Sequence, residues 1–268
     1  MECHDLVVTE EPLEIWLSAH PTAASKLLFT TMRTPGDDIN LVRGWLYSSG
    51  AVQDSKNIIS ITHSGTGRLK SMPTNRVQVN LAAGAHIEIA DYQRVEVMNS
   101  ACGVCGQQSI ESLLDKLPQA VMTHSQTSLL GMADIGSLTQ QLRNKQPIFN
   151  QTGGIHGVAL FDRRLQILDV HEDVGRHNAF DKLIGANLPM LAVENHESYL
   201  GVVLTSRASF ELIQKAAMVN IRYVIAMGAP SSLAIDLAKD CDICLIGFVK
   251  HAGVSTEFNV YSNPQMLV

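Results

Sequence analysis

The second half of the chain alternates between two kinds of apolar pattern. From residue 148 onward, short runs of apolar residues are separated by segments in which apolar residues recur at helical spacing. The short runs predict strands and the spaced segments predict helices. Strands are predicted at Leu165–Val170, Leu200–Thr205, Tyr223–Met227 and Ile243–Val249, and helices at Arg176–Ile184, Phe210–Val219 and Ser231–Lys239. This alternation predicts an α/β layered fold with a largely buried sheet.

The first half is richer in strand patterns. Asp37 and Asp38 provide N-cap chemistry before apolar residues at helical spacing, so one helix is predicted after them. Residues 5–17 predict one or two strands, and further strands are predicted at Asn57–Thr62, Arg76–Leu81, His86–Ile89 and Arg94–Met98. We expect a single unit over residues 1–268, with a smaller strand-rich portion over about 1–100 and an α/β portion over about 101–268.

Composition excludes several classes of protein. The 268 residues are 46% hydrophobic and 17% charged, which is typical of a globular protein with a core. The formal net charge of −6 does not predict binding to nucleic acid or to a membrane surface. No apolar run approaches the length of a membrane span, and the stretch Met1–Asp5 does not begin a secretory signal. We therefore expect a cytoplasmic protein with no nucleic-acid or membrane partner.

Two of the five cysteines stand in the segment Cys102-Gly103-Val104-Cys105. The pair precedes a predicted helix that starts near Gln107, and the free N–H groups and positive dipole end of a helix start favour a thiolate. A thiolate can attack the outer sulfur of a donor persulfide, and a second thiol can resolve or shield the product. The segment therefore predicts sulfur transfer through a persulfide on Cys102.

Other uses of the cysteines remain open, including two inert structural thiols. Cys241 and Cys244 form a second pair, but 136 positions separate Cys105 from Cys241, unlike the spacing of a zinc ribbon or finger. We interpret the second pair as mostly structural. A zinc deaminase carries H-x-E followed by P-C-x-x-C; the string His86-Ile87-Glu88 matches the first part, but Ala101 replaces the proline. A zinc-dependent deaminase-like or zinc-binding protein is the alternative hypothesis, and we assign no metal ligand.

Four polar segments in the second half are candidate binding elements: Thr152–Gly157, His171–Asn178, Ser206–Ser209 and Phe248–Gly253. The first has two glycines before what we predict to be a helix, which is compatible with an anion loop or a plain turn. The other three end predicted strands, the edge of an α/β sheet where ligands bind, so we expect them to converge. Capping by Asp173 is the alternative interpretation of the second segment, but capping needs one residue, and the two acids, two histidines, arginine and asparagine favour a binding site. The candidate ligand-binding residues in the first three segments are Gly153, Gly154, His156, Asp173, Arg176, His177 and Arg207.

Several strings together resemble the FdhD family. They are CGVCG at Cys102–Gly106, TGGIH at Thr152–His156, EDVGRHNAFDK at Glu172–Lys182 and SRASFE at Ser206–Glu211, with TPGDD at Thr34–Asp38 and GFVKHAG at Gly247–Gly253 as further matches. The resemblance covers roughly residues 5–262, and the combination of EDVGRHNA with CGVCG is highly specific. Two departures stand out: the family often has Ser-Gly-Arg at Thr205–Arg207, and it often has an arginine within Phe248–Gly253.

The resemblance implies a sulfurtransferase that is an accessory sulfur carrier for formate dehydrogenase. A cysteine desulfurase would load Cys102 with persulfide sulfur, and Cys105 would assist. The sulfur would pass to the molybdenum cofactor, bis-molybdopterin guanine dinucleotide, before its insertion into formate dehydrogenase. The family fold is similar to that of cytidine deaminases, and a homodimer is compatible with a two-pterin cofactor. The residues that would contact the cofactor, whose guanine part GDP would mimic, are Phe248, Val249, Lys250, His251, Ala252 and Gly253.

Overall fold

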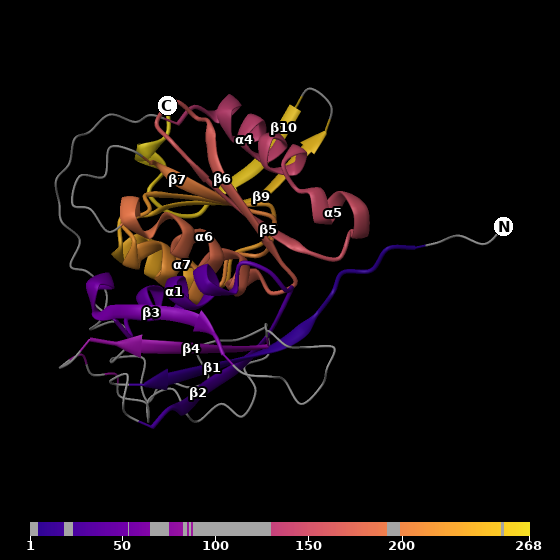
Figure 1. Cartoon of the computed structure of the whole chain (residues 1–268). Helices are drawn as coiled ribbons and strands as arrows, with labels where there is room; N and C mark the ends of the chain where they lie inside the picture. The colour runs from indigo at the N-terminus through magenta and orange to yellow at the C-terminus, as the bar shows by residue number, and fades with distance from the viewer. Residues whose placement is uncertain are drawn as a thin grey trace. The chain divides into compact units, whose positions relative to one another are not determined.

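The computed structural model describes residues 5–18, 24–52, 54–64, 75–82, 85, 87, 130–191, 199–252 and 255–268. The chain divides into two compact units, neither of which is continuous in sequence (Figure 1). The strand-rich unit consists of Val8–Lys116 and Asp173–Leu188, and the α/β unit consists of Met1–Val7, Leu117–Glu172 and Pro189–Val268. The chain therefore passes between units at Glu172–Asp173, inside the EDVGRHNAFDK string.

A four-stranded sheet, in the order β2-β1-β4-β3, forms the strand-rich unit. Its strands are β1 (Glu11–Ser18), β2 (Lys26–Arg33), β3 (Ile58–His63) and β4 (Arg76–Leu81). β1 is antiparallel to β2 and parallel to β4, and β3 is antiparallel to β4. Alternate residues of β4, namely Val77, Val79 and Leu81, are buried, as expected for a sheet with one covered face.

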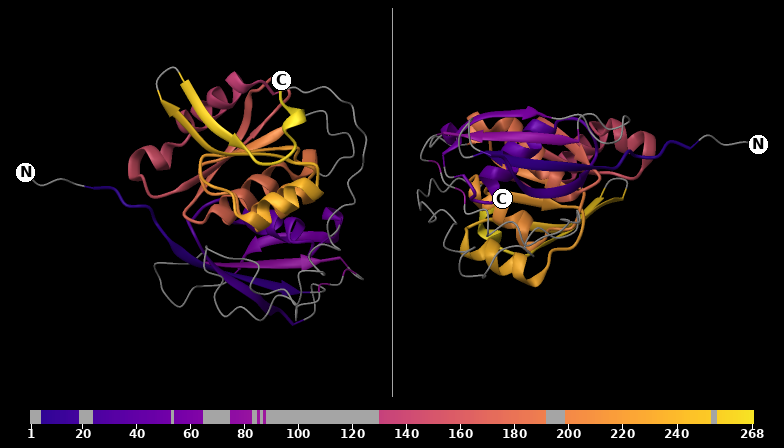
Figure 2. Two further views of the ribbon diagram at one scale, coloured as in Figure 1. Left: turned by 180° about the vertical axis from the view of Figure 1, so that it is seen from behind. Right: turned by 60° about the horizontal axis from the view of Figure 1, so that its bottom comes forward.

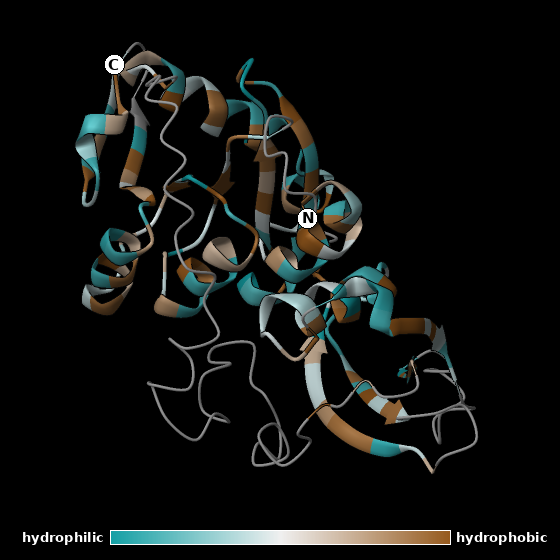
Figure 3. Cartoon of the chain, turned by 90° about the vertical axis from the view of Figure 1, so that its left-hand side faces the viewer, coloured by the Kyte–Doolittle hydropathy of each residue, from teal (hydrophilic) through white to brown (hydrophobic). Residues whose placement is uncertain are grey.

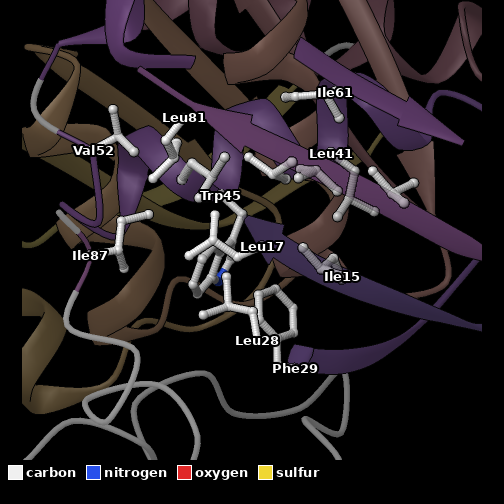
Figure 4. Close-up of a cluster of buried hydrophobic side chains, with 14 of the residues drawn as sticks. Ile15, Leu17, Leu28, Phe29, Leu41, Trp45, Val52, Ile61, Leu81 and Ile87 are labelled. Carbon is white, nitrogen blue, oxygen red and sulfur yellow. The ribbon is translucent and has the colours of Figure 1, made fainter. Parts of the chain in front are cut away.

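Helix α1 (Asp38–Ser48) supplies Leu41 and Trp45 to the core of this unit (Figure 4). The rings of Phe29 and Trp45 have centroids 4.3 Å apart. Helix α6 (Arg176–Leu191) approaches α1 closely through Gly44 and Gly185, because a Cβ atom on either glycine would overlap the backbone of the other helix. Both positions therefore require glycine.

A six-stranded sheet, in the order β10-β9-β8-β7-β5-β6, forms the α/β unit. Its strands are β5 (His156–Phe161), β6 (Ile167–Asp173), β7 (Gly201–Leu204), β8 (Tyr223–Ala226), β9 (Cys244–Ala252) and β10 (Ser255–Val260). β7, β8 and β9 are parallel, whereas β5 is antiparallel to β7 and β10 is antiparallel to β9. All residues of β7 and β8 are buried, which explains their continuous apolar runs.

Helices α4 (Met132–Asn144), α5 (Pro147–Thr152), α7 (Phe210–Met218) and α8 (Ser232–Asp240) complete the α/β unit. α4 packs through Ile135, Leu138 and Leu142 on the sheet face that carries Ala159 and Val203. α7 and α8 lie on the opposite side of the sheet (Figures 1 and 2). Helices in Figure 3 show brown apolar positions beside teal polar ones, and α4, α7 and α8 each bury part of their residues.

The mixed α/β fold class is confirmed, and its cytidine-deaminase-like layering stays a prediction. The predicted strands at residues 57–62, 76–81, 200–205 and 223–227 and the helices α7 and α8 agree with the structure to within about two residues. The strands predicted at His86–Ile89 and Arg94–Met98 lie wholly or mostly outside the described residues, as does the predicted portion boundary near residue 100. In the described structure, residues 173–188 group with the N-terminal strands rather than with the later α/β portion.

Two local predictions were wrong in detail. The glycines at 153 and 154 do not precede a helix: Gly153, at φ +66°, ends α5, and the strand β5 follows. A glycine just after a helix satisfies left-handed geometry that other residues adopt at a cost. The predicted helix after Asp37 exists, but the Asp37 side chain makes no capping bond; it accepts instead from Asn40 Nδ2 at 2.6 Å. Among the described residues, no helix is long and apolar enough to cross a membrane.

Candidate functional site

Two loops that follow parallel strands are joined by backbone hydrogen bonds. The loop after β8, Met227–Ser231, donates to the loop after β7, Thr205–Ser209, from Gly228 N to Ser206 O (3.1 Å) and from Ser231 N to Ala208 O (3.0 Å). In return, Ala208 N donates to Ala229 O at 3.2 Å. Each loop leads into a helix, α7 or α8. We call the group formed by these two loops with Gly157 and Phe248 the strand-end site. It lies where parallel strands end, the edge at which α/β sheets bind ligands.

Gly228 brings the two loops into contact. A Cβ atom added at Gly228 would lie 2.8 Å from Arg207 N and 2.9 Å from Arg207 Cα, so only glycine fits this position. Arg207 itself is exposed. Its guanidinium and the N-terminal ends of α7 and α8 all favour an anionic group. The exposed guanidinium and the two helix starts are compatible with the predicted anion-binding role of Arg207, which stays a prediction.

Phe248 interrupts the strand β9 at this site. Its φ of +55° is in the left-handed region, where a non-glycine residue costs about 1–3 kcal/mol. Its N–H donates to Gly228 O at 3.1 Å, and its ring is 41% exposed. The pairing of β9 with β10 shifts register between Glu257 and Asn259, opposite this stretch. The irregular backbone presents an aromatic ring to solvent beside the β8 loop.

The start of β5 is tied to the same site. Gly157 N donates to Thr205 Oγ1 at 2.9 Å, and Thr205 N donates to Gly157 O at 3.0 Å. His156, immediately before Gly157, is half-buried. Backbone hydrogen bonds thus connect three of the four predicted segments to the strand-end site, through Gly157, Ser206 and Phe248.

Glu172, from the fourth segment, caps a helix in the α/β unit. Its carboxylate accepts from Ile148 N at 3.0 Å and from Phe149 N at 2.9 Å, the first N–H groups of α5. Gln146 Nε2 lies 3.4 Å from the same carboxylate. A carboxylate at this position satisfies donors that a helix start leaves unpaired.

Asp173, one residue later, belongs to the strand-rich unit and is fully buried. Its carboxylate accepts from Gly175 N (2.8 Å), Thr34 N (3.1 Å) and Asn178 Nδ2 (3.2 Å), and it pairs with Lys182 Nζ at 2.7 Å. Burial raises the pKa of this carboxyl, while Lys182 and the other donors oppose the rise. These contacts hold the turn at Thr34. The cofactor-binding role of Asp173 stays a prediction.

The remaining predicted residues are placed as follows. Arg176 and His177 begin α6 in the strand-rich unit, where His177 is 7% exposed, and their cofactor roles stay predictions.

Val249 is buried in the core of the α/β unit, so only its backbone is available for the predicted contact, whereas Lys250 is exposed. β9 continues through Lys250, His251 and Ala252 rather than ending near Val249. Gly154 is exposed, and Gly253 lies outside the described residues.

The cysteines divide into two groups. Cys102 and Cys105 lie outside the described residues. Cys241 and Cys244 are free thiols. Burial, with the charges of Asp240 and Asp242, raises the pKa of Cys241 to about 11, and burial raises the pKa of Cys244 to about 12. Thiols with such pKa values are poor nucleophiles at neutral pH, which agrees with a structural role for this pair. Within the part of the chain that the structure describes, no cluster of His, Cys, Asp and Glu could hold a metal ion.

The contacts of three residues were not predicted from the sequence: Gly228 lies in the strand-end site, and Glu172 and Gln146 lie at the start of α5. Glu172 stood inside a highlighted string but looked like any other acid of it, because its capped helix α5 was not predicted. Gln146 gives no local signal beyond the proline that follows it. Gly228 follows a predicted strand, where a glycine also fits an ordinary turn. Only the packing of the loops reveals what each of these residues contacts.

Known proteins resemble this chain over nearly its whole length. A family model described as the FdhD/NarQ family matches residues 8–268. A sulfur carrier protein FdhD of Streptomyces coelicolor is 38% identical over 261 residues, covering 96% of this chain and 87% of the relative. Another, from Sulfolobus acidocaldarius, is 32% identical over 263 residues, covering 98% and 91%.

A solved structure shares the fold. The crystal structure of a protein from Desulfotalea psychrophila, provisionally described as a formate dehydrogenase accessory protein, matches with a TM-score of 0.70. The match covers 98% of this chain and 92% of that one at 23% identity. The family model and the relatives together confirm the resemblance seen in the signature strings, and the chain belongs to the FdhD/NarQ family.

Proposed function

We propose that this protein is a sulfurtransferase that carries sulfur as a persulfide on Cys102. The observation that carries the proposal is the family match over residues 8–268, a range that includes both Cys102 and Cys105. Relatives at 32–38% identity bear the name sulfur carrier protein. The raised pKa values of Cys241 and Cys244 support assigning the chemistry to the other pair.

The chemistry balances with two thiols. The Cys102 thiolate attacks the outer sulfur of a persulfide on a cysteine desulfurase, and the desulfurase cysteine leaves as a thiolate. The Cys105 thiolate then attacks the inner sulfur of the Cys102 persulfide and displaces sulfide. The new Cys102–Cys105 disulfide retains the oxidising equivalent, and a cellular thiol reductant returns both residues to thiols.

The acceptor in this proposal is the molybdenum cofactor bis-molybdopterin guanine dinucleotide, on its way to formate dehydrogenase in the cytoplasm. The strand-end site offers matching chemistry. Arg207 and the starts of α7 and α8 suit the phosphate groups, and the exposed ring of Phe248 suits a planar heterocycle.

The test is loading by a cysteine desulfurase followed by intact mass measurement. The wild-type chain is expected to gain about 32 Da per persulfide sulfur, and Cys102→Ala is expected to lose this gain. Cys241→Ala is the matched control and should load like the wild type, because its thiol stays protonated. An adduct that survives Cys102→Ala would refute the assignment.

A cellular assay separates a carrier from a shielding protein. The variants are expressed in cells that lack the native protein. Cys102→Ala is expected to leave formate dehydrogenase inactive, whereas Cys241→Ala is expected to restore its activity. Full activity with Cys102→Ala would mean that the protein only shelters the cofactor.

A further inference from the structure

Gln146 is an uncharged polar residue that is fully buried at the corner between α4 and α5. Its Nε2 atom lies 3.4 Å from the Glu172 carboxylate, and its Oε1 atom has no hydrogen-bond partner among the described residues. The opposite orientation of the amide would place its oxygen against that carboxylate, so the unpartnered atom is the oxygen. A buried acceptor without a donor is unfavourable to folding.

The side chain of Gln146 lies against Gly157. A Cβ atom added at Gly157 would lie 2.7 Å from Cδ and 3.3 Å from Cγ of Gln146, and closer still to Nε2. No side chain fits at position 157 while Gln146 keeps this conformation. The amide of Gln146 therefore packs directly on the backbone at the start of β5.

Gly157 connects this contact to the strand-end site. It forms two hydrogen bonds with Thr205, through its N–H and its carbonyl oxygen. Thr205 directly precedes Ser206 and Arg207, whose loop is bonded to the loop of Gly228. Gln146 thus packs directly on Gly157, and it reaches the Thr205–Ser209 loop through Gly157.

An apolar side chain of similar size would fill the same space without an unpartnered oxygen. A buried amide whose oxygen is unpartnered in the described structure points to a task other than stability. We propose that Gln146 is a positioning residue: it fixes Gly157, and through Gly157 and Thr205 it holds the Ser206–Arg207 loop in its ligand-binding geometry. This inference rests on the proposed function, because it takes the strand-end site as the place where the guanine nucleotide part of the cofactor binds.

The first test compares two glutamines of the same region. Gln146→Met is expected to leave the free energy of unfolding unchanged or higher, because it removes the unpartnered oxygen. It should weaken GDP binding by about tenfold in calorimetry, because methionine lacks the Nε2 bond to Glu172 that orients the side chain against Gly157. Gln141→Met is the matched control. The Gln141 amide bonds Leu165 O (3.1 Å) and Ile167 N (3.3 Å), so its loss should lower stability and spare GDP affinity.

The second test asks whether only volume matters at this contact. Gly157→Ala should weaken GDP binding, since the new Cβ atom displaces the Gln146 amide. In Gly157→Ala/Gln146→Ala the clash is gone, so the stability should recover while GDP affinity stays low. Recovery of both would overturn the proposal, because it would reduce Gln146 to a space-filling residue.

Amide hydrogen exchange tests the positioning role of Gln146 even if GDP fails to bind. Gln146→Met is expected to speed exchange in residues 205–209, whereas Gln141→Met should not. If the wild type does not bind GDP, the guanine part of the proposed function fails, and the exchange result alone supports or refutes the positioning role. Unchanged exchange in residues 205–209, or a loss of stability with intact GDP affinity, would refute it.

Discussion

Lys182 contacts two oxygen atoms from segments far apart in sequence, the Asp173 carboxylate at 2.7 Å and Thr34 O at 2.9 Å. Thr34 also receives a bond from Val174 N to its Oγ1 and donates its own N–H to Asp173. All the polar groups of Thr34 are thus bonded to residues of the string at 172–182. Individual residues of the EDVGRHNAFDK string therefore hold the buried turn at Thr34 in place.

Lys182→Met should lower the free energy of unfolding by about 3–5 kcal/mol, because it leaves the Asp173 carboxylate buried and unpaired. Urea unfolding measures the change. Lys239→Met is the control: Lys239 makes an exposed pair with Asp236 at 3.8 Å, whose loss should cost under about 1 kcal/mol. Equal losses for both variants would contradict the structural role of Lys182.

The defect of Lys182→Met should depend on pH. Burial raises the pKa of Asp173, and Lys182 opposes that rise. Without Lys182 the pKa of Asp173 should therefore rise further. A carboxyl with a raised folded-state pKa destabilises the fold when ionised, so its cost is largest at neutral pH and shrinks as the pH falls through that pKa. Asp173→Asn/Lys182→Met should lose this pH dependence.

At the scale of the element, α5 depends on a residue outside itself. It has only the residues Pro147–Thr152, it begins with a proline, and it ends at a left-handed glycine. So short a helix is not stable by propensity alone. The Glu172 carboxylate, from β6, supplies acceptors for its first N–H groups.

Glu172→Gln should destabilise α5 by about 1 kcal/mol, because one N–H loses its acceptor and the favourable charge at the helix start is removed. Hydrogen exchange of Ile148 and Phe149 should then rise about fivefold. Glu257→Gln, on the exposed side of β10, should leave these two amides unchanged. Unaltered exchange in Glu172→Gln would show that α5 forms without its cap.

At the scale of the whole molecule, each unit has its own apolar core. Ile15 belongs to the core of the strand-rich unit and Ile225 to that of the α/β unit, and both are fully buried. Ile15→Ala and Ile225→Ala should each cost about 2–5 kcal/mol. Exchange mapped along the chain should rise mainly within the unit that carries the substitution. If both variants accelerated exchange equally in both units, the cores would not be independent.

Patterns along the sequence predicted the α/β unit better than its site. The parallel strands β7 and β8 are buried on both faces, so their apolar runs are unambiguous. β10 and α5 carry mixed patterns that do not distinguish an element from a loop. Arg207 was predicted as a site residue because it follows an apolar run, and Phe248 because of the family resemblance; both roles stay predictions. The contact between Gln146 and Gly157, and the assignment of residues 173–188 to the other unit, depend on tertiary packing that no local pattern encodes.

The left-handed backbone of Phe248 has a consequence for directed evolution. Glycine at this position would relieve the strain at no steric cost, and asparagine would relieve part of it. A library screened only for heat resistance should therefore discard the phenylalanine early. A library screened for formate-dependent growth should keep it, and the difference in enrichment between the two screens would measure how much fitness the cell gains from one exposed ring.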